Sequence, residues 1–259
     1  MRIIYGATLA LSLSAACVQA QDFTPLDTDA WSGQLSLYGW VPGIKGDQER
    51  PDGDPLIDLD SSDVLDALNS AFFGTAEFRR GKFGVVLDLN YADLGQDGKA
   101  SGTIIPGADP ASADANTTIW MVTGVLAYRT YENEGRFVDV YGGLRYYDVD
   151  ADFTFKIPSI GFKNTLNLDT SWTDAIVGVR GQVPLGEKFS LTGLADVGGF
   201  GIGDSSNLSW EALATLDYAF TDRVIGRLGY RYMSIDNESD DLNLDLELGG
   251  PIIGLTWKF

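Results

Sequence analysis

Apolar and polar residues alternate over most of this chain, which is the period-two pattern of β-strands. The last eleven residues, 249–259, show the pattern well: Ile253, Leu255 and Trp257 alternate with small or polar residues up to the terminal Phe259. A strand built this way has one apolar face. Because aromatic rings collect where lipid meets water, a strand that ends on exposed rings suits a membrane surface. A strand of a soluble β-sandwich fits these eleven residues as well, so the rest of the chain has to decide.

Ten segments carry the same alternation. We predict strands over residues 31–40, 70–79, 83–91, 120–129, 138–147, 174–180, 189–197, 210–220, 227–232 and 242–259. The connections at 80–82, 132–136, 185–188 and 221–223 are tight, whereas those near 41–69, 93–116 and 148–170 are long. Short turns at one end and long loops at the other are typical of outer-membrane barrels. The pattern therefore predicts an all-β fold, a transmembrane antiparallel up-and-down β-barrel of ten strands. Eight or twelve strands stay open, because a long loop can hide a hairpin.

Two local features interrupt the alternation. The apolar phase changes between Leu242–Leu248 and Ile253–Phe259, which predicts a β-bulge at the Gly249-Gly250-Pro251 segment. Residues 61–68 read Ser-Ser-Asp-Val-Leu-Asp-Ala-Leu, which predicts a short N-capped helix within the first long connection.

Charged residues on the inward faces of the predicted strands distinguish a barrel from a sandwich. A sandwich buries its apolar face and exposes its charged face, whereas a barrel in lipid does the reverse. The inward positions hold seven acidic and seven basic residues: Glu77, Asp88, Asp139, Asp174, Asp196, Glu211 and Asp217, with Arg79, Arg129, Arg145, Arg180, Arg227, Arg231 and Lys258. Because guanidinium groups pair well with carboxylates, this balance predicts an ion-pair network inside the barrel.

The remaining charge lies mostly at the long-loop end. The chain has a formal net charge of −19, and the three long connections, Asp204 and residues 235–248 are all acidic on balance. This distribution favours a barrel with an acidic outer end. It also argues against nucleic-acid binding, which needs a basic surface.

Residues 1–20 read as a secretory signal peptide. Arg2 precedes an apolar stretch, and the Val18-Gln19-Ala20 segment offers a small-residue cleavage site. We therefore expect Sec-type export and cleavage near Ala20, a periplasmic tail over 21–30 and the barrel over 31–259. Cys17, the single cysteine, lies in a sequence that loosely resembles a lipobox, so lipidation is an alternative.

These features together resemble small bacterial outer-membrane β-barrel proteins of the OmpA, OmpW and porin-like group. The likeness rests on the leader, the alternating strands, the Ser36–Gly43 opening and the Thr256–Phe259 ending. It implies an outer-membrane location, with lipid and lipopolysaccharide as neighbours and the barrel assembly machinery as a partner. In that group the last strand is the assembly signal, here Ile253, Leu255, Trp257 and Phe259. The oligomeric state stays open.

The candidate chemistry is limited. With no histidine, and with no cysteine after cleavage, the chain has no Ser-His-Asp or Cys-His system and no zinc site built on His or Cys. We expect no enzymatic activity, with carboxylate acid–base chemistry as the residual alternative. We also expect no cofactor beyond loosely bound Ca²⁺ or Mg²⁺. The weak candidate ligands are acidic loop residues: Asp58, Asp60, Asp63, Asp240 and Asp241.

Two functional hypotheses follow from this barrel. In the first it is a narrow, cation-preferring pore for ions or small solutes. In the second it is a closed structural barrel whose acidic loops bind divalent cations, lipopolysaccharide or a partner. Small barrels are filled by side chains and open aqueous channels have sixteen or more strands, so ten strands favour a closed or narrow bore.

Overall fold

The computed structural model describes residues 30–47, 57–99, 111–238 and 243–259. The predicted signal peptide, almost all of the tail over 21–30, and Asp240 and Asp241 lie outside these residues. Among the described residues, no helix has the length and hydropathy of a membrane span.

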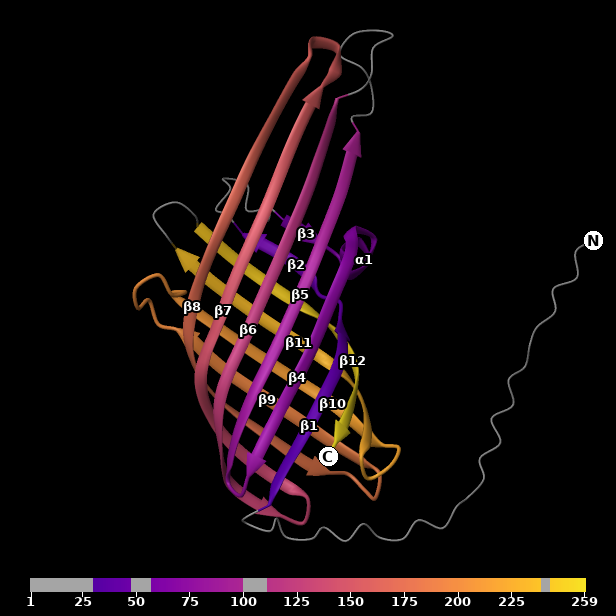
Figure 1. The fold of residues 1–259 in the computed structure, drawn as a ribbon, viewed down its shortest axis with the longest axis vertical. Coiled ribbons are helices and arrows are strands. Elements are labelled where there is room, and N and C mark those ends of the chain that lie inside the picture. Colours follow the sequence, from indigo (N-terminus) through magenta and orange to yellow (C-terminus); the bar gives the residue numbers. More distant parts are fainter. Residues whose placement is uncertain (1–29, 48–56, 100–110, 239–242) are drawn as a thin grey trace, which may run out of the picture.

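Ten long strands form the barrel wall (Figure 1). They are β1 (Trp31–Trp40), β4 (Leu68–Arg80), β5 (Phe83–Lys99), β6 (Ser112–Asn133), β7 (Arg136–Ile157), β8 (Phe162–Pro184), β9 (Phe189–Gly199), β10 (Leu208–Ala219), β11 (Val224–Glu238) and β12 (Asn243–Lys258). Each pairs antiparallel with the next, and β1 pairs with β12 to close the ring. The prediction of a ten-stranded antiparallel barrel is confirmed.

The first long connection contains most of the remaining regular structure. It carries β2 (Gly43–Asp47), β3 (Ile57–Leu59) and α1 (Ser61–Ala67). Strand β2 pairs with the first part of β12, and β3 pairs with β2. The predicted helix is present, and Asp60 and Asp63 form a capping box at its start.

The barrel closes where its first and last strands meet. The backbone N–H of Gly33 donates to the carbonyl of Phe259 at 2.8 Å, and the N–H of Phe259 donates back at 2.9 Å. A side chain at Gly33 would lie 2.4 Å from the Phe259 ring, so the ring covers this glycine. The start of β1 and the C-terminus therefore lie at the same end as the tight turns, as Figure 1 shows.

Aromatic pairs on the outer surface mark two levels. The rings of Phe83 and Tyr128 pack in a tilted arrangement with centroids 5.1 Å apart near the tight turns. The rings of Tyr91 and Trp120 do the same at 4.5 Å farther out. On both strands the two levels are eight residues apart, which is about 26 Å along a tilted strand. At a strand tilt of about 35–45° this is a rise of about 20 Å along the barrel axis, somewhat less than the apolar band of about 25 Å between the aromatic girdles of outer-membrane barrels.

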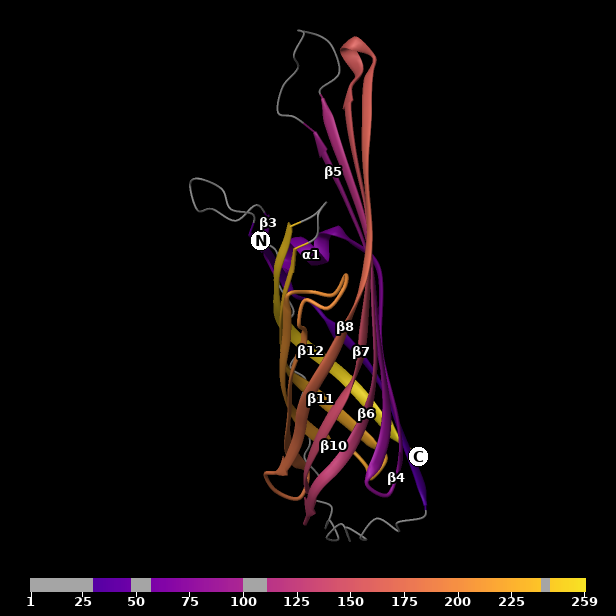
Figure 2. The same cartoon turned by 90° about the vertical axis from the view of Figure 1, so that its left-hand side faces the viewer.

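Three neighbouring strands run far beyond the outer girdle. Strands β6 and β7 have 22 residues each and β8 has 23, whereas about 9–11 residues cross a membrane. Figure 2 shows these strands, with the end of β5, standing above the rest of the barrel as a sheet; we call this sheet the wing. The prediction of long loops near 93–116 and 148–170 was therefore wrong for most of those residues. The alternation in 147–157 continues the strand instead.

At the outer girdle the polarity of both faces of the wall reverses: the outward face changes from apolar to polar, and the inward face from polar to apolar. On β7 the outward residues are apolar from Val138 to Tyr146, and the next three outward residues are acidic: Asp148, Asp150 and Asp152. The inward residues beyond the same point are apolar: Tyr147, Val149, Ala151 and Phe153. Outside the membrane the outer face meets water, so its polarity reverses while the strand itself continues.

Strand β12 shows the same reversal of polarity, and the bulge predicted on this strand is absent. Its pairing with β11 continues without a register shift from Asn243 to Trp257, so no bulge occurs at Gly249-Gly250-Pro251. Leu246 and Leu248 face inward, whereas Ile253 and Leu255 face outward. The phase of the hydrophobic pattern changes because the apolar side of the wall changes, and the backbone stays regular.

Candidate functional site

The bore is crossed by ion pairs in the half near the tight turns. Asp139 on β7 is fully buried and accepts hydrogen bonds from three arginines, Arg79 at 2.7 Å, Arg129 at 2.6 Å and Arg180 at 2.8 Å. Arg180 also donates two bonds to Glu77, at 2.8 and 2.9 Å. Glu77 lies on β4 and Arg180 on β8, which are four strands apart in a ring of ten. This inner cluster therefore spans the bore.

A second cluster lies on the outer side of the first. Arg145 donates to Asp196 at 3.0 and 3.1 Å and to Glu211 at 2.7 Å. Arg231 lies 2.8 Å from Glu211 and donates to Asn90 at 2.9 Å. Since Arg231 is on β11 and Asn90 on β5, this outer cluster also joins opposite walls.

Three further predicted charges, Asp217, Arg227 and Asp88, lie farther from a group of opposite charge than those of the two clusters. Asp217 accepts from Thr192 and Thr215, both at 2.7 Å, and Arg227 is 3.8 Å away. Asp88 bonds Thr75 at 2.6 Å and Tyr38 at 2.8 Å, with Arg231 at 3.8 Å.

Two of the predicted charges form no ion pair within the part of the chain that the structure describes. Asp174 is fully buried and accepts from the N–H of Ser206 at 2.8 Å and the hydroxyl of Ser209 at 2.6 Å. It therefore holds the β9–β10 connection rather than an arginine. Lys258 is exposed at the inner end of β12 and has no carboxylate within pairing distance.

Neutral residues complete the outer cluster, and the charge analysis did not select them. Tyr38 donates to Asp88, and Tyr141 donates to Asp196 at 2.9 Å. Asn90 donates to Asp88 at 2.6 Å. Each occupies an inward position of its strand, so the alternation pattern alone could have identified them.

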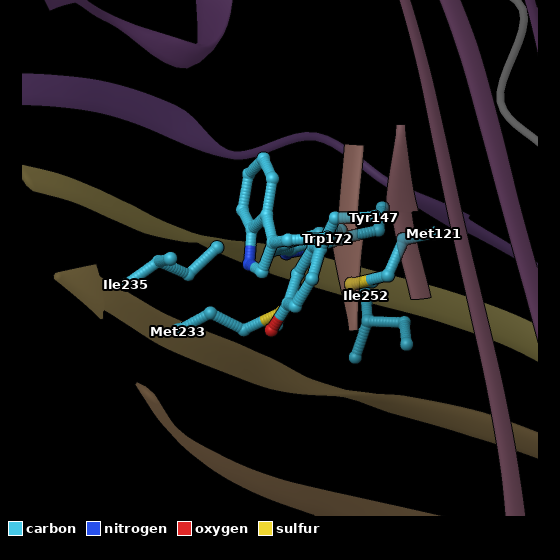
Figure 3. Close-up of a cluster of buried hydrophobic side chains, with 7 residues drawn as sticks. Met121, Tyr147, Trp172, Met233, Ile235 and Ile252 are labelled. Carbon is cyan, nitrogen blue, oxygen red and sulfur yellow. The ribbon is translucent and has the colours of Figure 1, made fainter. Parts of the chain in front are cut away.

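Beyond the outer cluster the bore becomes apolar. A cluster of buried side chains contributed by six strands lies there: Trp40, Met121, Tyr147, Trp172, Met233, Ile235 and Ile252. Figure 3 shows Met121, Tyr147, Met233 and Ile252 converging from different strands. All residues of this cluster except Ile252 line a cavity of about 570 Å³, which we call the apolar chamber, together with residues of the wing and of α1. The charged half retains a cavity of only about 160 Å³.

Trp40 lies at the boundary between the two halves. Its ring is 4.7 Å from the guanidinium of Arg231, a cation–π contact. Tyr147 and Trp172 stack at 4.8 Å, and the indole N–H of Trp172 donates to Ser206 at 2.9 Å. The floor of the chamber is thus aromatic and rests on the ion pairs.

The helix α1 lies beside the chamber on its outer side. Val64 is buried and lines the chamber, whereas Leu65 also lines it but is 52% exposed. The hydroxyl of Ser61 donates to the carbonyl of Val41 at 2.9 Å and fixes the helix to the end of β1. Because Leu65 is both exposed and part of the lining, the chamber reaches the protein surface next to α1.

The residues predicted for assembly and metal binding are placed as follows. Ile253, Leu255, Trp257 and Phe259 all point outward and are more than half exposed; their role as an assembly signal stays a prediction. Asp58 lies on β3, and Asp60 and Asp63 cap α1. No group of three or more His, Cys, Asp or Glu is arranged for a metal ion among the described residues. Binding of Ca²⁺ or Mg²⁺ stays a prediction.

The sequence matches no protein-family model and no curated protein. Solved structures do resemble the fold. The outer membrane protease OmpT from Escherichia coli matches with a TM-score of 0.50 and 8% identity, over 92% of this chain and 99% of that one. The translocator domain of the autotransporter NalP from Neisseria meningitidis matches with a TM-score of 0.44 and 16% identity, over 90% and 91%. Ail of Yersinia pestis matches with a TM-score of 0.35 and 14% identity, over 89% and 99%.

At these identities the likeness concerns the fold alone. The ring of ten strands, the outward apolar band with its two aromatic levels and the charged interior agree with it. The chain therefore has the fold of an outer-membrane β-barrel, a closed antiparallel ring of ten strands.

Proposed function

We propose that this protein is an integral outer-membrane barrel that does not conduct, with a bore closed in its periplasmic half and a functional half that faces outward. The pairing of Glu77 with Arg180 across four strands carries this proposal. Short turns and both ends of the barrel sequence mark the periplasmic side in such barrels, so the ion pairs lie toward the periplasm.

The energetics of the ion pairs support closure. Asp139, Arg145, Glu211 and Arg231 are each 4% exposed or less. A buried charge that loses its partner costs about 3–5 kcal/mol. A permeant ion or solute would have to separate several such pairs in two successive layers. Thermal motion of single side chains is therefore not sufficient to open a pore.

The competing hypothesis is a narrow cation-preferring pore. The small cavity among the charged residues is the observation that favours it, since its lining includes carboxylates such as Asp88 and Asp196. Its volume of about 160 Å³ lies between arginines that span the bore, however. A closed barrel therefore explains the interior better.

Single-channel recording in planar bilayers tests the proposal. The refolded mature protein is expected to be silent. A quadruple variant, Glu77→Ala, Arg180→Ala, Arg145→Ala and Asp196→Ala, removes one pair from each cluster without changing the net charge. We expect it to show steady conductance steps, because both layers then have gaps.

A matched control removes an ion pair that lies outside the bore. Lys156 and Asp114 pair at 2.5 Å on the wing, and a Lys156→Ala, Asp114→Ala variant should stay silent. Steady, cation-selective steps in the unmodified protein would refute the closed barrel and favour the narrow pore.

A further inference from the structure

The apolar chamber is too large to be a packing fault. Protein interiors are packed nearly as densely as organic crystals, with few voids larger than a water molecule. A cavity of about 570 Å³ lies in the range of about 300–1,000 Å³ found for ligand pockets. Its lining is mostly aliphatic or aromatic, with side chains from the barrel wall, the wing and α1. The polar members are Asn90, Thr117, Thr170 and Asp245. A chamber of this kind suits a hydrophobic molecule.

One buried polar group in the chamber lacks a partner. Trp40 is only 7% exposed, and its buried indole N–H donates no hydrogen bond. The neighbouring Trp172 differs, since its N–H donates to Ser206. A buried donor left unpaired costs about 1–3 kcal/mol. An acceptor atom on a bound molecule would remove this cost.

A second group supports the same reading. The hydroxyl of Tyr147 also makes no hydrogen bond of ordinary geometry, although Arg145 and Ser209 are near it. Tyr147 is 4% exposed and lines the chamber. Trp40 offers only a donor, and Tyr147 offers a donor or an acceptor. A ligand with one acceptor oxygen would therefore find a partner at the floor of the chamber.

The charges below the floor indicate that the ligand is neutral. Arg231, the cation closest to the floor through its contact with Trp40, already pairs with Glu211 and donates to Asn90. Arg145 is held by two carboxylates. An anionic ligand would have to replace one of these acids. Asp245, the carboxylate in the chamber lining, already has an interaction partner within the protein, so a cationic ligand would have to compete for it.

We propose that the apolar chamber binds one small, uncharged hydrophobic molecule that carries a hydrogen-bond acceptor oxygen, such as a ketone, ester or ether. The oxygen accepts from the indole N–H of Trp40, and the hydrocarbon part lies against the side chains of β6, β7, β8 and β11. The molecule enters from the outer surface beside α1. The site does not depend on whether the bore conducts.

Quenching of tryptophan fluorescence by a brominated ligand measures this binding. The mature protein in lipid nanodiscs is titrated with 10-bromodecan-2-one and with 1-bromodecane, which lacks the oxygen. Both values are corrected for partition into the same lipid. We expect saturable quenching, with the ketone binding about five-fold tighter, since one hydrogen bond contributes about 1 kcal/mol. Trp172 remains as a reporter when Trp40 is replaced.

Two variants separate the hydrogen bond from the chamber. Trp40→Phe should bind both probes with equal affinity, because the donor is gone and the apolar lining remains. Ala151→Phe fills the chamber from the inward face of β7 and should abolish saturable quenching, and Ala92→Phe does the same from β5 if the first variant does not fold. Thr154→Phe, on the outward face of β7, is the control and should bind normally.

Three results would overturn the proposal. Quenching that rises linearly in the unmodified protein would mean partition into lipid only. Equal affinity for the two probes in the unmodified protein would remove the role of Trp40. Binding that survives both Ala151→Phe and Ala92→Phe in folded protein would place the ligand elsewhere.

Discussion

The guanidinium of Arg231 lies 4.7 Å from the ring centre of Trp40, at the level where the charged half of the bore meets the apolar half. The contact joins two regions with different requirements. Below it, Arg231 pairs with Glu211, and each charge depends on its neighbours. Above it, the ring of Trp40 presents an apolar surface to the chamber. One aromatic ring thus covers the ion pairs and forms part of the chamber floor.

Replacement of Arg231 should destabilise the whole barrel. In Arg231→Met, Glu211 keeps only Arg145, and Asn90 loses a donor. Breaking a buried ion pair costs about 3–5 kcal/mol, so we expect a loss of this size in the free energy of unfolding. Urea unfolding in lipid vesicles, followed by tryptophan fluorescence, measures it.

Lys156→Met is the matched control. The Lys156–Asp114 pair is partly exposed, with 43% and 22% of the two side chains accessible. Exposed pairs contribute about 0–1 kcal/mol. Equal losses in the two variants would show that the bore is hydrated and that its ion pairs contribute no more than surface pairs.

Replacement by alanine should destabilise the protein at only one of two adjacent glycines on β7. A Cβ on Gly143 would lie 2.0 Å from the carbonyl oxygen of Gly124, so the backbone of β6 would have to move. A Cβ on Gly142 would meet its nearest neighbour at 3.5 Å, an ordinary contact. We expect Gly143→Ala to cost about 1–3 kcal/mol or more, as overpacking does, and Gly142→Ala to be nearly neutral.

The same unfolding measurement compares the two glycine variants. They change neighbouring residues by one methyl group each, so differences in strand propensity cancel. A nearly neutral Gly143→Ala would show that β6 and β7 can separate at this point without loss of stability.

The alternation of residues was sufficient to predict the barrel. Inward charges such as Asp139 and Arg145, and outward rings such as Trp257, occupy the faces that a period of two assigns to them. The partners of each charge were not predictable. Asp174 sits on the inward face like Asp196, yet it bonds Ser206 and Ser209 because the β9–β10 connection folds back over it. Such a contact depends on three-dimensional proximity that no spacing in the sequence encodes.

The apolar chamber was also missed for a physical reason. Residues such as Val149 and Leu248 are apolar on the inward face, which contradicts the rule for strands in lipid. The contradiction led to a predicted loop on β7 and a predicted bulge on β12. Both strands are continuous, and the rule itself reverses above the outer girdle, where water replaces lipid.

Asp174 should control the β9–β10 connection. Asp174→Ala leaves the N–H of Ser206 and the hydroxyl of Ser209 without their acceptor. Unpaired buried donors cost about 1–3 kcal/mol each, so we expect residues 200–207 to detach from the barrel. Chymotrypsin should then cleave after Phe200 much faster than in the unmodified protein.

Asp204→Asn provides the control for cleavage, because Asp204 is an exposed residue of the same connection. It removes one negative charge without removing an acceptor from Ser206. Cleavage that accelerates equally in both variants would attribute the effect to charge near the protease site rather than to the anchor.

The reversal of polarity on β7 can be measured directly with cysteine labels. Leu144 and Asp152 point outward from the same strand, eight residues apart. Leu144 lies between the two aromatic levels, so its position meets lipid, whereas Asp152 lies above the outer level on the wing.

The single native cysteine, Cys17, is in the predicted leader, so the mature protein offers a background without thiols. The cysteine thiolate attacks the maleimide, and this thiolate forms only where water reaches the sulfur. With a charged, membrane-impermeant maleimide on intact cells, we expect Asp152→Cys to react at least about tenfold faster than Leu144→Cys, since lipid suppresses ionisation and access. In denaturant both variants should react at one rate, which controls for intrinsic reactivity. Equal rates on intact cells would place both positions in the same environment, and the wing would then not project beyond the membrane.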